Sequence, residues 1–254
     1  MLPIADPWFY FAAFPAVILV GLSKGGFGGT LAMLAVPILT LAISPIQAAG
    51  IMLPILLLMD VVALLAYRGR ADWTCLAFML PAAVVGIVIG WAAAAWVNDN
   101  FITLLVGVTS LAFVADYVFK RRKQETASGH KPAWGFFWGG VAGFTSFISH
   151  TGGPPYQMYT VPLRMPKLLF AGTAVIFFAT VNAIKVVPYF FLGQFDTTNL
   201  ATSAVLMPLA LVATLAGVRL IKIINADTFY KLIYVFMGLI GTKLTYDGLA
   251  NLFA

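Results

Sequence analysis

Long apolar blocks separated by short polar stretches recur along the whole chain, and they restrict it to a membrane fold. Most of these blocks run for 15 to 25 residues, which suits helices that cross a hydrocarbon core of about 30 Å. A core helix of a soluble protein shows an amphipathic period, and a membrane β-barrel shows alternating strands of about ten residues. The continuous blocks show neither pattern. The sequence therefore predicts an all-α polytopic membrane protein.

Composition supports the same class and narrows the ligands. Hydrophobic residues make up 61% of the chain and charged residues 9%, whereas soluble domains carry about 25% charged residues. The single cysteine, Cys75, excludes a disulfide framework or a thiolate metal cluster within one chain. The formal charge of +6 is distributed in a way that indicates membrane topology rather than nucleic-acid binding. We expect no metal and no cofactor.

The apolar blocks form two sets of five on either side of the charged stretch Lys120–Lys131. We predict a first transmembrane repeat over residues 1–119, a basic linker over 120–132 and a second repeat over 133–254. The blocks cover approximately residues 8–22, 28–43, 46–67, 74–97, 101–119, 134–148, 154–163, 168–192, 199–221 and 229–247.

Landmarks recur in the same order in the two halves, which predicts an internal duplication. Asp60 pairs with Asn182, Asp72 with Asp196, and the offsets between matched positions lie between 121 and 128. Because each half has an odd number of segments, the two repeats are expected to run through the membrane in opposite senses. Inverted repeats of this kind are common in transporters.

The basic residues predict the orientation of the chain. With the linker in the cytoplasm, twelve of the fifteen lysines and arginines lie on the cytoplasmic side, in agreement with the positive-inside rule. Both termini are then outside. The three remaining basic residues are Lys24, Lys185 and Lys243.

The first two blocks of each half are short, so we expect half-helices joined by a glycine-rich turn within the membrane. Residues 8–22 span about 22 Å as a helix and residues 154–163 about 15 Å. Glycine allows a tight turn, and non-helical backbone at membrane depth is tolerated where it lines a cavity or is buried in protein. The turns contain Ser23, Lys24, Gly25, Gly26 and Gly28 in one half and Ser149, His150, Thr151, Gly152 and Gly153 in the other.

These turns are predicted to bind a small anion. Helices that restart after the turns present unpaired N–H groups and the positive end of the dipole, and the side chains add hydrogen-bond donors. By pseudo-symmetry the two turns should face each other. The alternative is that the glycines only allow close helix packing, that Lys24 extends to an interface, and that His150 bonds a carbonyl.

Polar residues on the third block of each half complete the candidate site. Asp60 corresponds to Asn182, and Lys185 follows Asn182 by one helical turn. Buried ionisable residues in membranes need a partner or a function. Asp60 is either a counter-ion for a lysine or, like His150, a candidate for proton coupling. Asn182 and Lys185 either line the pathway or bond between helices.

At these residues the sequence resembles the TauE/SafE family of sulfite and organosulfonate exporters, within the toluene-sulfonate-uptake-type permeases. The resemblance covers nearly the whole chain and is most specific at Gly21–Gly29, with further similarity in the central linker and in Gly143–Pro155 followed by Val161 and Pro162. It implies a sulfur-containing anion as the transported substrate and a plasma membrane location.

Together these features predict a secondary transporter that exports sulfite or an organosulfonate across the inner or plasma membrane by alternating access. An anion channel is the alternative. A membrane-embedded hydrolase is disfavoured, because the adjacent Ser149 and His150 point in different directions and no second base lies near. No enzymatic activity is expected. A homodimer is a further expectation.

Overall fold

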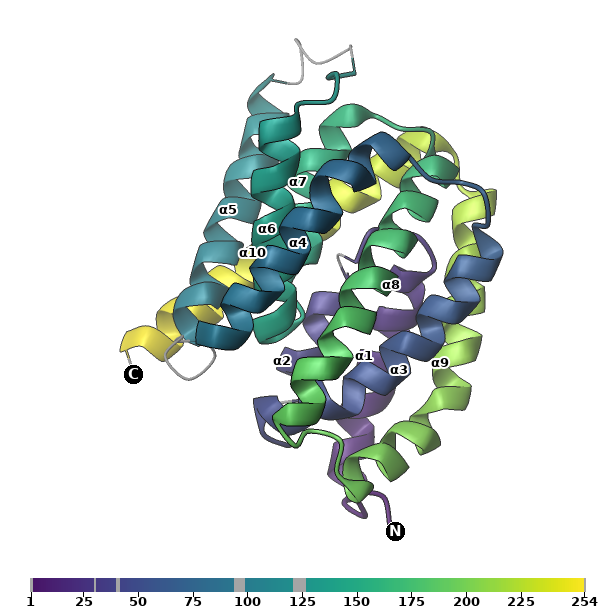
Figure 1. Ribbon diagram of the computed structural model, residues 1–254, viewed down its shortest axis with the longest axis vertical. Coiled ribbons are helices and arrows are strands. Elements are labelled where there is room, and N and C mark those ends of the chain that lie inside the picture. The colour runs from purple at the N-terminus through teal and green to yellow at the C-terminus, as the bar shows by residue number, and fades with distance from the viewer. Residues whose placement is uncertain (1, 30, 40–41, 94–98, 121–126, 254) are drawn as a thin grey trace. The chain divides into compact units, whose positions relative to one another are not determined.

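The computed structural model describes residues 2–29, 31–39, 42–93, 99–120 and 127–253. Within these ranges all regular elements are helices (Figure 1), so the predicted all-α fold is confirmed. In chain order they are α1 Pro7–Lys24, η1 Leu31–Leu34, α2 Ala35–Leu39, α3 Pro45–Ala66, α4 Trp73–Ala93, α5 Asp99–Lys120, α6 Pro132–Ser149, α7 Gly153–Thr160, η2 Val161–Leu163, α8 Lys167–Phe191, α9 Thr197–Ile223 and α10 Ala226–Phe253, where η denotes a 3₁₀-helix.

The first segment of each half is longer than the sequence predicts. Helices α1 and α6 each contain 18 residues, or about 27 Å, which approaches the full hydrocarbon thickness. Only the second segments are short: η1 and α2 in the first half, and α7 and η2 in the second. Each half therefore pairs one nearly full-length helix with one short segment.

Length and apolar surface identify the helices as membrane spans. In the described part of the chain, five helices are long and apolar enough to cross a bilayer: Pro7–Lys24, Gln47–Ala66, Trp73–Ala93, Lys167–Phe191 and Thr197–Ile223. Large apolar side chains are exposed on them, for example Phe11, Leu65, Val88 and Val212. Lipid tails cover such a surface, whereas water would not tolerate it. The chain is a multi-pass membrane protein.

Short polar residues fix where several helices begin. Asp6 accepts a hydrogen bond from the Trp8 N–H at 2.9 Å, and Pro7 follows as the first helical residue of α1. Asp72 accepts from the Cys75 N–H at 2.9 Å at the start of α4, and Asp196 accepts from the Asn199 N–H at 2.8 Å at the start of α9. Asp72 and Asp196, paired as repeat landmarks, thus have the same capping role.

The helices form two compact units that do not follow the two halves of the sequence. Unit 1 consists of Met1–Ala71 and Leu168–Ile223, and unit 2 consists of Asp72–Lys167 and Ile224–Ala254. Each unit therefore combines segments from both halves. The two units are defined by contacts between residues, whereas the two repeats are defined by similarity between the halves of the sequence. The repeats stay a prediction.

Close packing of α1 against α9 holds unit 1 together. A Cβ atom on Gly21 would lie 2.4 Å from the Ala213 Cβ, and one on Gly25 would lie 2.4 Å from the Gly217 Cα. The two backbones touch because these positions carry no side chain or a small one. Helix α3 also packs on α9, and a cluster of buried apolar residues that includes Phe9, Met52 and Leu206 fills the space between the helices.

Unit 2 uses the same small-residue packing between α4 and α6 and between α5 and α10 (Figure 1). A Cβ on Gly143 would lie 2.2 Å from the Ala83 carbonyl oxygen, and one on Gly86 would lie 2.1 Å from the Gly140 carbonyl oxygen. Likewise, a Cβ on Gly107 would lie 2.5 Å from the Thr245 nitrogen.

The helix pairs of the two units correspond under the predicted repeat. In unit 1 the first helix of the first half, α1, packs on the fourth helix of the second half, α9. In unit 2 the first helix of the second half, α6, packs on the fourth helix of the first half, α4. The packing of α3 on α9 has no counterpart between α8 and α4 among the described contacts, so the duplication and the opposite sense of the two repeats both stay predictions.

We expect Gly143→Ala to destabilise the protein and Gly140→Ala, on the same helix, to leave it unchanged or more stable. The methyl group introduced by Gly143→Ala would collide with the α4 backbone. A Cβ on Gly140 would have its nearest neighbour at 3.6 Å. Overpacking costs about 1–3 kcal/mol, and alanine in a helix gains up to about 1 kcal/mol over glycine. Thermal unfolding in detergent measures both; equal effects would contradict the close packing.

Candidate functional site

The glycine-rich turn of unit 1 follows directly after Lys24, the last residue of α1. Gly26, Gly28 and Gly29 have positive φ angles of 138°, 66° and 80°, a region of backbone conformation that glycine enters without strain. The sequence placed Ser23 and Lys24 within the turn, but the structure places both in the last helical turn of α1. The Lys24 side chain therefore projects from a regular helix.

Contacts with three other helices fix the conformation of this turn. The Tyr67 hydroxyl, at the end of α3, donates a hydrogen bond to the Gly25 carbonyl. A Cβ on Gly26 would lie 2.7 Å from the same hydroxyl and 3.0 Å from Ile221 in α9, and one on Gly29 would lie 3.0 Å from the Phe178 ring in α8. Side chains of α3, α8 and α9 thus pack directly against the glycine backbone and leave no space for a Cβ atom at Gly26.

Ser23 closes the turn from its other side. Its Oγ accepts a hydrogen bond from the Leu31 N–H at 3.1 Å, across the turn. The predicted donor thus acts as an acceptor here, and it satisfies a backbone N–H group at the start of η1. Ser23 has a structural role in this arrangement.

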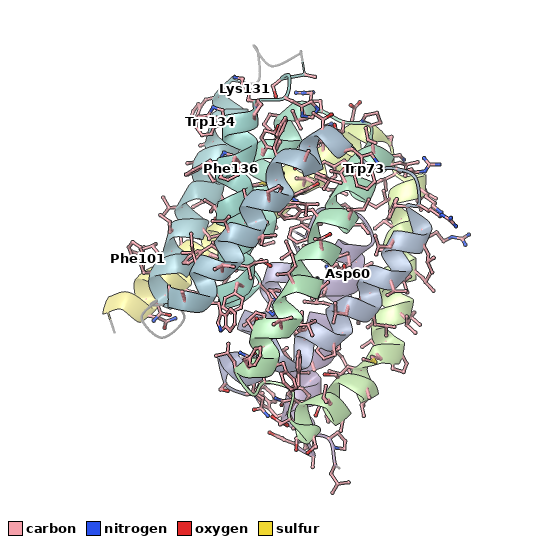
Figure 2. All side chains as sticks on the ribbon, in the orientation of Figure 1. Asp60, Trp73, Phe101, Lys131, Trp134 and Phe136 are labelled. Carbon is pink, nitrogen blue, oxygen red and sulfur yellow. The ribbon has the colours of Figure 1, made fainter. Side chains whose placement is uncertain are left out.

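A buried chain of polar contacts joins three of the predicted site residues. The Lys24 ammonium donates to Asp60 Oδ1 at 2.6 Å, and the Asn182 amide donates to Asp60 Oδ2 at 2.6 Å. The side chains of Lys24 and Asp60 are only 5% and 3% exposed. Asp60 lies on α3 (Figure 2), whereas Lys24 and Asn182 come from α1 and α8. Asp60 is therefore the counter-ion of Lys24.

Lys185 adds a second buried lysine side chain to this cluster. Its side chain is fully buried, its Nζ lies 5.9 Å from the centre of the Tyr189 ring, and it interacts electrostatically with both Lys24 and Asp60. The Lys24 ammonium lies 5.5 Å from the centre of the Phe178 ring. Aromatic faces attract cations and so lower the cost of burying them.

Basic side chains outnumber acidic ones in the interior of unit 1. Among its described buried side chains, the basic groups are Lys24 and Lys185 and the acidic group is Asp60. An anion that enters this region meets the N–H donors of both lysines. The cluster, which we call the lysine cluster (Lys24, Asp60, Asn182 and Lys185), is a candidate anion site.

The second turn lies in unit 2 and is held by hydrogen bonds back to the last turn of α6. His150 ends α6 in the left-handed conformation, with φ 56°, and its N–H donates to the Ser146 carbonyl at 3.2 Å. The Thr151 N–H and the Thr151 hydroxyl both donate to the Thr145 carbonyl at 3.3 Å, while the Thr145 hydroxyl donates to the Val141 carbonyl of its own helix at 2.8 Å. His150, Thr151, Gly152 and Gly153 are all buried. The Ser149 side chain lies outside the described part of the chain.

Only one of the two turns leads into a helix long enough for a dipole argument. Helix α7 begins at Gly153 and contains eight buried residues. After the first turn the chain continues as the four-residue η1 and the five-residue α2, whose dipole is small because few peptide groups are aligned. In unit 1 the candidate anion-binding groups are therefore lysine side chains rather than a helix end.

A comparison with known protein families decides the class of the protein. The family described as "Sulfite exporter TauE/SafE" matches residues 13–244, nearly the whole chain. The chain belongs to the TauE/SafE family. No curated protein and no solved structure matches it. The predicted resemblance is confirmed, and with it membership in a family of membrane exporters of sulfur anions.

The structure groups the predicted site residues of this TauE/SafE protein into two sets. Lys24, Asp60, Asn182 and Lys185 come together in unit 1, although 161 positions separate the first from the last. His150 and Thr151 belong to unit 2. That the two turns face each other stays a prediction, as do the roles of all these residues in binding.

Several residues that shape the site carry no distinctive signal in the sequence. Tyr67, Phe178 and Tyr189 lie in ordinary apolar runs, and only their contacts with the turn and the lysines distinguish them. His130, in the linker, contacts Asp72 through Nε2 at 3.1 Å and the Tyr159 hydroxyl through Nδ1 at 3.4 Å. The end of the linker is thus attached to unit 2.

No metal site accompanies these residues. Within the residues that the structure describes, no group of three histidine, cysteine, aspartate or glutamate side chains is arranged to hold a metal ion. In the lysine cluster the two lysines and the Asn182 NH2 group are donors, which bind anions, and Asp60 is an acceptor.

We expect Lys24→Met or Asp60→Leu alone to lower the stability by about 3–5 kcal/mol, because each leaves a buried charge without its counter-ion. The double variant should be more stable than either single variant. Unfolding of the wild type, the two single variants and the double variant by denaturant in detergent measures the four free energies of unfolding that are compared.

The exposed pair Lys243–Asp247 of α10 is the matched control. The same substitutions there should change stability by at most about 1 kcal/mol. Additive losses for Lys24 and Asp60 would show that the buried pair does not act as a unit.

Proposed function

We propose that this TauE/SafE protein is a secondary transporter that exports a small sulfur-containing oxyanion, sulfite or an organosulfonate, across the plasma membrane. The observation that carries this proposal is the lysine cluster, where two buried lysines accompany one buried carboxylate. Family membership supplies the substrate class, and the cluster gives an electrostatic reason why such an anion enters an otherwise apolar interior.

The donors of the lysine cluster suit an oxyanion. Sulfite and sulfonates carry several oxygen atoms on one sulfur, and each oxygen accepts hydrogen bonds. Lys24 and Lys185 supply charge and rotatable N–H donors, while the Asn182 amide supplies a neutral, directed donor. Phe178 and Tyr189, which lie near the two ammonium groups, offer apolar contact to the organic part of a sulfonate.

The second turn provides the other half of the proposed pathway. We propose that His150, Thr151, Gly152 and Gly153 also contact the anion in the course of the transport cycle. Rocking of two repeats around a site near mid-membrane is a common means of alternating access. The buried position of His150 and Thr151 supports their assignment to a pathway in the protein interior.

The membrane potential is a sufficient driving force for export. With the linker in the cytoplasm and both termini outside, as the basic residues predict, an anion leaves a compartment that is electrically negative. Outward movement of one negative charge across about 100 mV gains about 2.3 kcal/mol. Asp60 and His150 are the candidates for carrying a coupled proton.

Anion binding should raise the melting temperature of the purified protein, and Lys185→Met and His150→Gly should abolish that rise. Ligand at about 100 times Kd adds about 2.7 kcal/mol to the stability of the folded state. Glycine is chosen at His150 because φ is 56° there. The panel comprises sulfite, sulfate, thiosulfate, taurine, methanesulfonate and chloride.

Lys243→Met, which removes an exposed charge from α10, serves as the control and should retain the full rise. If no anion raises the melting temperature, or if both site variants respond as the wild type does, the site assignment is wrong. A shift lost in Lys185→Met but kept in His150→Gly would confine the site to unit 1.

If a proton is coupled to transport, Asp60→Asn should eliminate anion-dependent proton movement in proteoliposomes that contain a pH-sensitive dye. The amide cannot bind or release a proton near neutral pH, and it preserves the shape of the carboxyl group. Unchanged proton movement would exclude Asp60 and leave His150 as the candidate. Anion flux that does not saturate with concentration would favour a channel instead.

A further inference from the structure

We propose that the Asp60 carboxylate is a tethered competitor of the transported anion. In the arrangement described, Asp60 occupies the Lys24 and Asn182 donors that the substrate takes over during transport. This inference rests on the proposed function, because it requires an oxyanion to enter the lysine cluster. It assigns to Asp60 a role opposite to that of a binding residue: Asp60 lowers the affinity of the site.

The geometry of the carboxylate resembles that of a bound oxyanion. Its two oxygen atoms accept separately, Oδ1 from the Lys24 ammonium and Oδ2 from the Asn182 amide, both at 2.6 Å. Sulfite and sulfonate groups likewise present neighbouring oxygens on a single central atom. The same two donor groups can therefore hold either anion, and in this proposal they hold them in turn.

The composition of the lysine cluster supports this exchange. The cluster contains two lysines and one carboxylate, so an anion that enters it meets more basic than acidic side chains. When the substrate takes the Lys24 and Asn182 donors, Asp60 remains within the electrostatic range of Lys185. Lys185 and Asn182 lie three positions apart on α8, on the same helix face.

Competition of this kind also serves the release of the substrate. After the anion leaves, the carboxylate returns to Lys24 and Asn182, so neither donor is exposed to the apolar interior alone. An exporter must release its substrate at one side and return empty. A tethered anion accomplishes both steps with one residue.

The direct test compares the affinity of wild type and Asp60→Asn for methanesulfonate, a permanent monoanion, by calorimetry in detergent. The variant should bind about tenfold more tightly or better, since a hydrogen bond to a charged group contributes at least that factor. Asp247→Asn, which removes the carboxylate of the exposed pair on α10, should bind as the wild type does. Weaker or unchanged binding in Asp60→Asn overturns the proposal.

A measurement on the wild type decides the question if Asp60→Asn fails to fold. A hydrophobic carbodiimide modifies carboxyl groups within membranes, and mass spectrometry reports the extent at each residue. Methanesulfonate should accelerate the modification of Asp60 several-fold, because it displaces the carboxylate from its donors, and should leave Asp247 unaffected. Protection of Asp60, or an unchanged rate, contradicts displacement.

The outcomes separate this inference from the function on which it rests. If neither the wild type nor Asp60→Asn binds sulfite, methanesulfonate or taurine, the proposed function fails and the inference with it. If the wild type binds an anion and Asp60→Asn binds it no more tightly, the function stands, and Asp60 is only a counter-ion.

Discussion

A charged group in the interior of a membrane protein requires a partner of opposite charge, and the interior of unit 1 is organised around this requirement. Lys24 on α1 and Asn182 on α8 both donate to Asp60 on α3. One carboxylate therefore joins three helices that are distant in the sequence. A second lysine, Lys185, is also buried in this interior, so basic side chains outnumber acidic ones there, and this imbalance is the basis of the proposed anion site.

The lysine cluster is held in position by a backbone that side chains would disrupt. The turn after α1 contains three glycines with positive φ angles, and Tyr67, Phe178 and Ile221 occupy the space where Cβ atoms would otherwise lie. Glycines at the contacts of α1 with α9 and of α4 with α6 allow backbone to touch backbone. In lipid, where apolar surface gives little driving force for helix association, such close packing is the principal source of cohesion.

The sequence predicted the elements better than their assembly. Every apolar block corresponds to helical structure, because block length and polar punctuation are local properties. The first turn was predicted from Gly25, Gly26 and Gly28, but Lys24 was assigned to the turn instead of to α1. The sequence pattern is the same whether a helix ends at a lysine or just before it. The lengths of α1 and α6 were underestimated because the sequence pattern does not mark the exact ends of a helix.

The pairing of Asp60 was left open by the sequence for a different physical reason. An aspartate that serves as a counter-ion and one that carries a coupled proton look the same in the sequence. Only the distance from the carboxylate to its partners distinguishes the two roles. Lys24 and Asp60 are 36 positions apart and Asp60 and Asn182 are 122 apart, so their contacts depend on tertiary packing that no local pattern encodes. The aromatic residues beside the lysines, Phe178 and Tyr189, were missed because apolar runs contain many such residues.

The exchange of helices between the two halves has a consequence for biosynthesis. Unit 1 consists of α1 to α3 together with α8 and α9, so its first helices leave the ribosome more than a hundred residues before the last ones. During that interval α1 and α3 reside in the bilayer without α9, and Asp60 lacks the amide of Asn182. Lys24 and Asp60 are both present from the start, and their ion pair is the contact that shields these charges until synthesis of the second half is complete.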